Sequence, residues 1–400
     1  MRKTLLGLVL LALTLPQLSV QAIEYYTFTL ETGKTVATKG KSYLFGVPYT
    51  ANMTDLECTT DEGAIFDERV SVYVYDGSRR ANGQDPWVKL EYDADLYAGK
   101  CYKMVLDNCT GNTWKVGHTF TPTETKRLTL ATNTSSSALN SGWNGMANPR
   151  WSLATTSFNA VTYAYAYRNK EAVYELVKLS SRTWDVGEPF ILQTSVGSSM
   201  SFSEDGTGFD FGGTMGGGDI FDAPQRGQTE ADNVFSLQSV SGGYTDKAYL
   251  TLVESRKSSY IIGQDLEKLH GDGTGVPQLW LRAYDADLAV HTAATMNSEV
   301  SIPMYIYVPA DGSYALQVAG ADAAKFQLLL NGTTVSKNIT YWTLNLTQGE
   351  HVLTLKVGNS VPTDIQTPTT TSTATKFVRN GQLYILKDGQ IYNALGGKAE

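Results

Sequence analysis

The sequence is poor in charge. Asp, Glu, Lys and Arg make up 18% of the 400 residues, below the quarter that is usual for soluble proteins. Basic residues number 32 and acidic residues 40, so the formal net charge is −8. Binding to a phosphate backbone needs clustered basic charge, and this composition therefore argues against a nucleic-acid partner. Hydrophobic residues reach 42%, so the chain can bury a core and is not globally disordered.

Motifs that mark catalytic sites are also missing. No two of the four histidines are spaced four apart, and neither an HExxH motif nor a GxSxG elbow occurs. Nothing singles out a pair of opposed carboxylates, which glycoside hydrolysis would need. We therefore expect a protein that is not an enzyme. A hydrolase whose site is assembled from distant residues stays open, because geometry and not sequence order defines such a site.

Cysteine is scarce, with Cys58, Cys101 and Cys109 as its three positions. Cys101 and Cys109 are eight residues apart, which suits the two ends of a turn or two adjacent strands, so a disulfide between them is one prediction. The other is that all three are reduced and buried. Zinc binding is not expected, since no CxxC motif or paired histidine accompanies them.

One long apolar run is present, at the start of the chain. A basic segment, Met1–Thr4, precedes the apolar residues Leu5–Pro16, and small residues follow at Val20 and Ala22. This order predicts a secretory signal peptide cleaved after Ala22, and hence a secreted or cell-surface protein. The run is too short to span a bilayer, and no second stretch of 18 apolar residues occurs, so no transmembrane helix is expected.

Tyrosine and glycine are abundant, at 23 and 37 residues, which is typical of strands joined by tight turns. Two stretches share one layout of strands and Gly-marked turns, which predicts two related β units. In the first, the alternating strand Val72–Tyr75 is followed by a turn at Gly99. In the second, Tyr163–Tyr167 is followed by a turn at Gly187. The tripeptides Gly46-Val47-Pro48 and Ala147-Asn148-Pro149 stand at matching places in the two stretches.

Further short strands at roughly ten-residue spacing predict an antiparallel sandwich after the Gly-rich stretch. The expected fold class is all-β, with tandem antiparallel sandwich-like modules and a short C-terminal β-meander after a Thr-rich linker. The expected divisions are a signal peptide (1–22), a first module (23–130), a second module (138–203), a Gly-rich boundary (204–232), a sandwich (233–358), a Thr/Ser/Pro linker (359–375) and a β tail (376–400).

The tail has a repeat of its own. Asn380-Gly381-Gln382-Leu383-Tyr384 recurs eight residues later as Asp388-Gly389-Gln390-Ile391-Tyr392. Both Asn-Gly and Asp-Gly favour two-residue hairpin turns. We expect three strands, one before Asn380 and two near 382–386 and 390–394.

Few residues suggest a ligand. Trp143 and Trp151 flank the Asn148-Pro149 turn and are the best candidates for exposed aromatics that stack on a sugar; the alternative is that they fill cores. Asp205 and Asp272 lie in Gly-rich acidic loops, where Ca²⁺ is one interpretation and a solvated loop the other. No other cofactor is indicated.

Four segments resemble those of large secreted and cell-surface proteins of the Bacteroidales. They lie at 76–102, 141–149, 249–280 and, in the tail, 381–396. In that group a C-terminal β module often serves as the sorting signal of the type IX secretion route. The resemblance implies export across the outer membrane and contact with that secretion machinery.

Together these features predict a non-enzymatic binding or adhesion protein at the cell surface or in the medium, with a surface glycan or a protein as its ligand. A dedicated carbohydrate-binding protein and an extracellular hydrolase are the alternatives.

Overall fold

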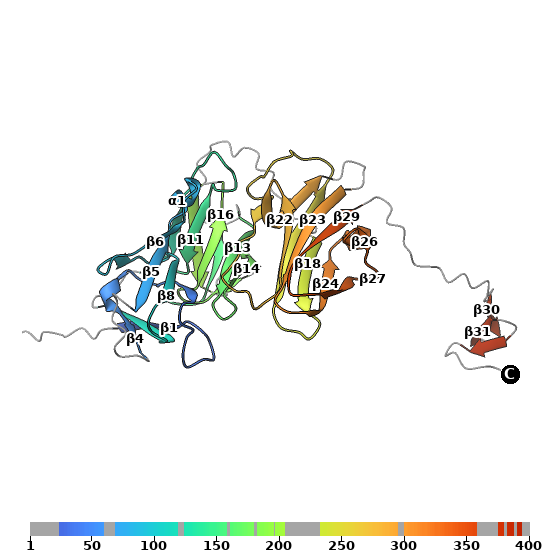
Figure 1. Ribbon diagram of the computed structural model, residues 1–400, viewed down its shortest axis with the longest axis horizontal. Coiled ribbons are helices and arrows are strands. Elements are labelled where there is room, and N and C mark those ends of the chain that lie inside the picture. The colour runs from blue at the N-terminus through green and yellow to red at the C-terminus, as the bar shows by residue number, and fades with distance from the viewer. Residues whose placement is uncertain are drawn as a thin grey trace, which may run out of the picture.

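The computed structural model describes residues 24–59, 69–118, 124–157, 161–179, 182–195, 197–204, 233–294 and 300–357, and the backbone of three tail strands (Figure 1). The predicted all-β fold class is confirmed. Strands dominate the described residues, and their helical elements are short: η1 (Met53–Asp55), α1 (Gly77–Ala81) and η3 (Ala323–Lys325). The signal peptide with Ala22, residues 205–232 of the Gly-rich boundary, and residues 359–374 of the linker lie outside the described residues.

The first unit packs two sheets around one core. One sheet has the order β2-β8-β5-β6; the other side is formed by β1-β9-β4 and the pair β3-β7. Tyr43, Val72 and Met104 from the four-stranded sheet meet Leu56 and Trp114 from the other side in this core. The strands are β1 (Glu24–Thr29), β2 (Ser42–Phe45), β3 (Ala51–Asn52), β4 (Leu56–Cys58), β5 (Val70–Tyr75), β6 (Trp87–Lys89), β7 (Asp95–Leu96), β8 (Tyr102–Leu106) and β9 (Thr113–His118).

The second unit repeats the arrangement of the first. Its sheet β11-β16-β13-β14 corresponds to β2-β8-β5-β6, and its sheet β10-β17-β12-β15 corresponds to β1-β9-β4 together with the pair β3-β7. From the sequence, the first module was predicted to extend to residue 130. In the structure, however, β10 pairs with β17, with Arg127 opposite Ser201, so β10 is the first strand of the second unit. The strands are β10 (Arg127–Leu130), β11 (Trp143–Ala147), β12 (Ala154–Ser157), β13 (Tyr163–Arg168), β14 (Val173–Lys178), β15 (Thr183–Trp184), β16 (Pro189–Gln193) and β17 (Ser198–Glu204).

The two units also share a turn. Gly99 and Gly187 both have positive φ, 76° and 66°, a conformation that favours glycine. Gly99 N–H donates to the Val47 carbonyl in the first unit, and Gly187 N–H donates to the Asn148 carbonyl in the second. The same hydrogen bond at the same place in two sheets of the same order supports an internal repeat.

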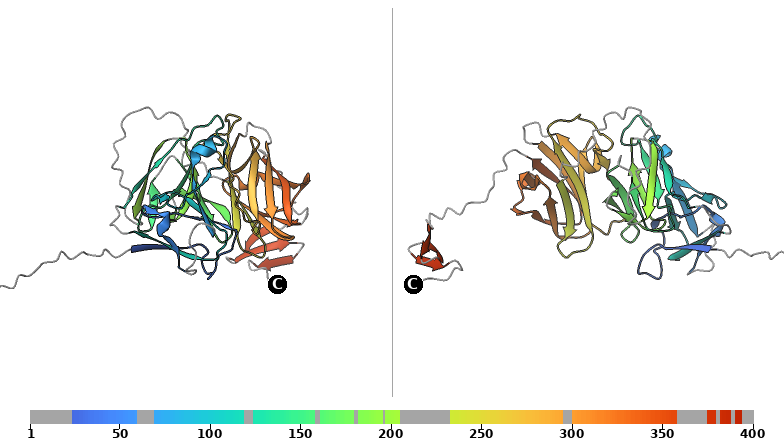
Figure 2. Two further views of the ribbon diagram at one scale, coloured as in Figure 1. Left: turned by 60° about the vertical axis from the view of Figure 1, so that its left-hand side comes forward. Right: turned by 180° about the vertical axis from the view of Figure 1, so that it is seen from behind.

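The sheet β11-β16-β13-β14 is apolar on both faces. One face packs against β10-β17-β12-β15, with Phe190 and Leu192 in the core between them. The opposite face carries Tyr163, Tyr165 and Trp143, all at most 5% exposed. This second face, which we call the junction face, is covered partly by the first unit and partly by the C-terminal sandwich (Figure 2).

The C-terminal sandwich is one 12-stranded sheet that curls on itself, so that Phe235 of one half meets Phe326 of the other with ring centroids 5.1 Å apart. Its strand pairs are antiparallel except β19 with β22. Its strands are β18 (Asn233–Ser239), β19 (Thr245–Val253), β20 (Leu266–Glu267), β21 (Gln278–Ala283), β22 (Ala286–Ala294), β23 (Val300–Val308), β24 (Gly312–Ala319), β25 (Phe326–Leu330), β26 (Thr333–Thr334), β27 (Lys337–Asn338), β28 (Tyr341–Leu346) and β29 (Gly349–Val357).

The connection between β19 and β21 joins the sandwich to the second unit. Tyr260 Oη donates to Gln193 Oε1 at 2.5 Å, and Tyr165 Oη donates to the Glu267 carbonyl at 2.6 Å. Within the connection, Asp265 is buried and accepts hydrogen bonds from Arg256 Nη2 at 2.6 Å and from His291 Nδ1 at 2.9 Å. Burial alone would raise the pKa of Asp265, but these two donors bring it below its usual value.

The tail forms the predicted meander. Its strands β30 (Thr375–Arg379), β31 (Gln382–Lys387) and β32 (Gln390–Asn393) pair in sequence order. The dipeptides Asn380-Gly381 and Asp388-Gly389, for which turns were predicted, stand between these strands in the sequence and lie outside the described residues.

Close packing across the junction face leads to a first prediction. A Cβ added at Gly145 would lie 2.5 Å from the Cβ of Tyr75, an atom at the root of its side chain that cannot move aside cheaply. We expect Gly145→Ala to lower the free energy of unfolding by about 1 to 3 kcal/mol, because overpacking forces the two units apart. Chemical denaturation measures this.

Gly275→Ala is the matched control. Nothing lies within 4 Å of a Cβ at Gly275, and its φ is not in the left-handed region. Equal stability of the two variants would show that the two units do not pack as described.

Candidate functional site

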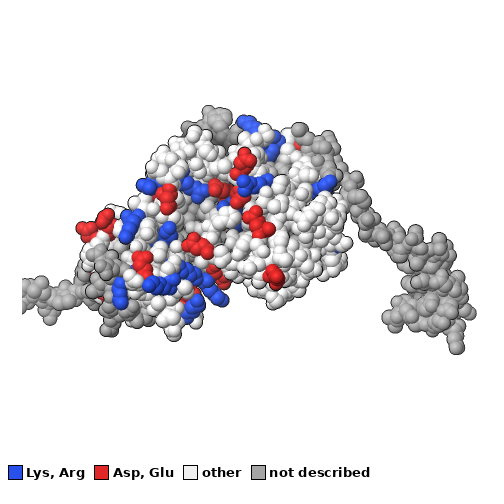
Figure 3. Space-filling view, in the orientation of Figure 1, with Lys and Arg blue, Asp and Glu red and all other residues white. Residues whose placement is uncertain are grey.

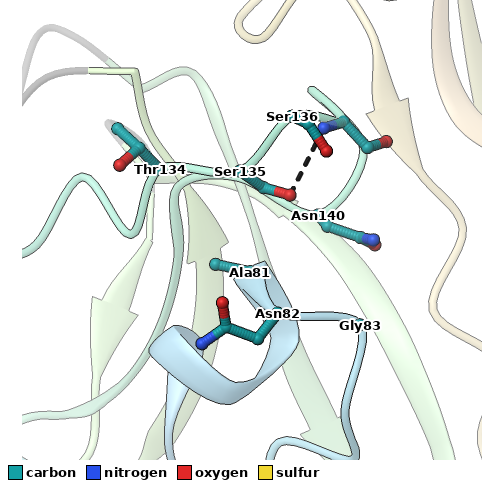
Figure 4. Close-up of a pocket in the computed structure, with 8 residues that line it drawn as sticks. Ala81, Asn82, Gly83, Thr134, Ser135, Ser136 and Asn140 are labelled. Carbon is teal, nitrogen blue, oxygen red and sulfur yellow. Dashed lines mark hydrogen bonds between the residues drawn. The ribbon is translucent and has the colours of Figure 1, made fainter.

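A cleft of about 640 Å³ opens between the end of α1 and the loop before β11 (Figure 4). Both of its walls are polar and uncharged. The lining residues are Ala81, Asn82, Gly83, Thr134, Ser135, Ser136, Ser137 and Asn140.

The first wall is the C-terminal end of α1. Asp76 begins the helix, since its Oδ1 accepts hydrogen bonds from the Ser78 amide at 2.8 Å and the Ser78 hydroxyl at 2.6 Å. The helix ends at Asn82, whose N–H donates to the carbonyls of Ser78 and Arg79. Gly83 follows with φ at 71°, which turns the chain away from the helix and leaves Asn82 at the rim of the cleft.

Arg80 holds this wall in place. Its guanidinium lies 4.0 Å from the centre of the Trp143 ring, and its Nη2 is 2.8 Å from Glu267 Oε2 in the C-terminal sandwich. Burial raises the pKa of Glu267, and the nearby Arg80 only partly offsets this rise. One side chain therefore ties α1 to both the second unit and the sandwich.

The second wall is the loop 131–142. Asn133, with φ at 40°, donates from Nδ2 to the Trp143 carbonyl at 2.8 Å. The Ser141 hydroxyl accepts from the Ser135 N–H at 2.9 Å and donates to the Ser137 carbonyl at 3.1 Å. Ser135 Oγ in turn accepts from the Ser137 amide, the contact dashed in Figure 4. These bonds fix the loop without using every polar group on it.

Four side chains at the cleft keep unused hydrogen-bonding capacity. In the described part of the chain, no hydrogen bond involves the side chains of Asn82, Thr134, Ser136 or Asn140. Figure 4 shows Asn82 on the helix side of the cleft and the other three on the loop side. They offer carboxamide and hydroxyl groups, each able to donate and to accept.

The two tryptophans that the sequence suggested as sugar-binding candidates differ in their exposure to solvent. Trp143 is fully buried, and its Nε1 donates to the Leu139 carbonyl at 2.7 Å, so of its two alternatives exposure for stacking is wrong and core filling is what the structure shows. Its side chain is part of the junction face, which strands far away in the sequence cover. Trp151 is 45% exposed, and Leu153 beside it is 47% exposed. Trp151 therefore remains a ligand-binding candidate, although it does not line the cleft.

The predicted Cys101–Cys109 disulfide is also wrong, because the structure places neither cysteine in a disulfide bond. Cys101 lies in the core of the junction face, whereas Cys109 lies in the core of the first unit. The alternative of reduced, buried cysteines is the one that the structure shows.

The calcium candidates gain no support. Asp205 lies outside the described residues, and Asp272 is exposed. Gly271 and Gly273 beside it pack closely on the backbone of Glu171 and Ala172, which explains two of the loop's glycines by packing. No group of three or more His, Cys, Asp or Glu side chains suited to a metal occurs in the ranges that the structure describes.

Sequence reasoning missed the cleft. The run Thr132–Ser137 is readable as a polar loop, and Asp76 as the start of a turn or helix. Nothing in the sequence indicates that the two come together, because 50 residues separate Asn82 from Thr132 and their meeting depends on the packing of two units.

The Arg80 contact leads to a second prediction. We expect Arg80→Ala to lower the free energy of unfolding at pH 7 by on the order of 2 kcal/mol, because it leaves the partly buried Glu267 carboxylate without its counter-ion. The pKa of Glu267 in the folded variant then rises further above its unfolded value. Protonation at lower pH relieves the cost, so the loss shrinks as the pH falls from 7 to about 4.5.

Arg79→Ala is the control for this variant. Arg79 lies on the same helix, where its Nε donates to the Asp85 carbonyl. A loss within about 0.5 kcal/mol at both pH values is expected for it. Equal losses for the two arginines, or a loss for Arg80→Ala that does not change with pH, would contradict the described role of Arg80. Chemical denaturation curves at pH 7 and at about pH 4.5 measure the free energies of unfolding of both variants.

Comparison with known proteins identifies no relative of the chain. No protein-family model matches it, and no curated protein or solved structure shows significant similarity. In the described residues, no helix is long and apolar enough to cross a membrane.

Proposed function

We propose that this protein is an exported, non-enzymatic binding protein and that its ligand is a neutral glycan held in the cleft between α1 and the loop 131–142. The observation that carries the proposal is that one cleft is lined by Asn82, Thr134, Ser136 and Asn140, four polar side chains with no hydrogen bond to other described residues.

The chemistry of the cleft suits a polyhydroxylated ligand. Sugar hydroxyls donate and accept hydrogen bonds, as carboxamides and side-chain hydroxyls do, so both walls can pair with one ring. The lining residues carry no formal charge, which favours a neutral sugar over an acidic one. The fixed loop and the anchored helix keep these groups in place before a ligand arrives, and this reduces the entropy lost on binding.

Binding is a better interpretation of this cleft than hydrolysis. Glycoside hydrolysis needs a general acid and a second carboxylate, and acyl transfer needs a base beside the nucleophile. The cleft is lined by amides, hydroxyls and small side chains, without a carboxylate or an imidazole. Its side chains can form hydrogen bonds with a ligand, but none of them is a general acid or base.

A panel of neutral oligosaccharides tests the proposal. We expect at least one to bind, and Asn82→Ala and Asn140→Ala each to weaken it by roughly 3- to 10-fold, the effect of one lost hydrogen bond. Calorimetry on the mature chain measures the affinities. Asn345→Ala is the matched control, because it removes an exposed carboxamide on the C-terminal sandwich.

Two outcomes would contradict the cleft as the site. The first is that no neutral oligosaccharide binds. The second is that Trp151→Ala abolishes binding while Asn82→Ala leaves it unchanged, which would move the ligand to the exposed tryptophan.

We further propose that the chain is exported and sorted to the cell surface or the medium through its C-terminal module. Residues 1–22 and the resemblance of the tail to sorting modules support this. The intact mass of the protein from the outer membrane and from the culture medium of its host is the test. We expect a mass that lacks residues 1–22 and the tail beyond about Thr375.

Retention of the tail through Glu400 in both fractions would rule out sorting that is coupled to cleavage of the tail. A mass that still includes residues 1–22 would rule out cleavage of the signal peptide.

A further inference from the structure

A second groove, separate from the cleft, runs along β14. It has a volume of about 460 Å³ and lies between the second unit and the C-terminal sandwich. It is lined by Glu175, Leu176, Val177, Lys178, Arg182, Thr183, Lys247 and Tyr249. Four consecutive residues of one strand are among them. Because successive side chains of a strand point to opposite faces, a groove that touches four in a row lies along the edge of that strand.

Among the described residues, no strand pairs with that edge from Tyr174 to Lys178. β14 is the end strand of the sheet β11-β16-β13-β14, and in the described residues it pairs with β13 alone. Leu179 N–H donates to the Thr162 carbonyl, so the residue after β14 directs its amide toward β13. Backbone groups alternate along an antiparallel strand, and those of Tyr174, Leu176 and Lys178 therefore point outward, into the groove.

The charge of the groove is positive. Three of its lining residues are basic and one is acidic. Glu175 already pairs with Arg168 Nη1 at 3.1 Å, and Arg182 pairs with Glu188. Lys247 is exposed and takes part in no ion pair of the described residues, and Lys178 is exposed at the end of β14. In the view of Figure 3, basic and acidic side chains are mixed over the two N-terminal units, whereas the sandwich shows few charges, so the positive charge of the groove is local to its lining.

We propose that β14 accepts an extended, acidic peptide as an additional strand. The outward amides and carbonyls supply the backbone hydrogen bonds, as in other cases of strand addition. A new strand would lie about 4.8 Å from β14. The carboxylates of the new strand then meet Lys178 from one wall and Lys247 from the other. This partner is a protein segment, distinct from the neutral glycan proposed for the cleft.

The choice of a peptide over an acidic glycan rests on the backbone edge. An anionic sugar would use the cations but has no backbone groups to pair with the outward amides and carbonyls of Tyr174 and Leu176, whereas a peptide strand pairs with these groups as well as with the cations. Lysine at an edge strand also discourages pairing with a second, identical strand, because like charges repel. It favours a partner of opposite charge.

The test is a titration of the mature protein with fluorescent eight-residue peptides, followed by anisotropy. One peptide alternates Glu with Val, one alternates Lys with Val, and one is the Glu-Val peptide N-methylated at every second residue on its pairing edge. We expect binding of the first alone. In Lys178→Glu/Lys247→Glu we expect its affinity to fall at least tenfold, since both side chains are exposed and the fold tolerates the change.

Lys89→Glu/Lys257→Glu is the control. It makes the same change of charge at two exposed lysines, one of them on β6, the end strand of the first unit's sheet, and should bind the Glu-Val peptide as the unchanged protein does. Asn82→Ala should also leave this binding intact, which separates the groove from the glycan cleft.

Three results would overturn the proposal. The Glu-Val peptide fails to bind. The N-methylated peptide binds equally well, which would show attraction by charge without strand pairing. Or short oligogalacturonate displaces the peptide at equal concentration, which would make the groove a site for acidic glycans.

Discussion

The rest of the structure depends on the burial of the junction face. The sheet β11-β16-β13-β14 presents aromatic side chains on the side away from its own core, Tyr163, Tyr165 and Trp143 among them. An apolar sheet face left in water costs roughly 25 cal/mol for each Å² exposed, so it has to be covered. The first unit covers one part and the C-terminal sandwich the other. The second unit is therefore the layer on which both neighbours are assembled.

Polar contacts specify how these neighbours dock. Hydrophobic burial has no direction, whereas a hydrogen bond or ion pair between buried groups requires a defined geometry. Arg80 stacks on Trp143 and reaches Glu267, so one residue of the first unit contacts the second unit and the sandwich together. In the connection between β19 and β21, the Asp265 carboxylate pairs with Arg256 and with His291. Both recognition surfaces depend on this docking: the cleft has Arg80 behind one wall, and the groove takes one wall from each side of an interface.

Particular residues show how far local patterns reach. Alternation in Val72–Tyr75 and Tyr163–Tyr167 predicted strands, and both are strands. The Asn-Gly and Asp-Gly dipeptides predicted the tail meander, which is present. These successes concern neighbours along the chain. The failures concern distant partners. The sequence left open whether Trp143 is exposed or fills a core, and it placed β10 in the wrong unit. The partners that decide both points, Gln193 opposite Trp143 and Ser201 opposite Arg127, are far away in sequence.

The sequence by itself determined the class of fold, the two related units and the tail repeat, because the period of side chains along a strand and the chemistry of turns act within a few residues. Only the tertiary structure decided that Trp143 is buried while Trp151 is exposed, and that the three cysteines are buried and form no disulfide. It also decided where the cleft and the groove lie. Both are formed by segments from different parts of the chain, and the position of such segments follows from which apolar faces cover one another.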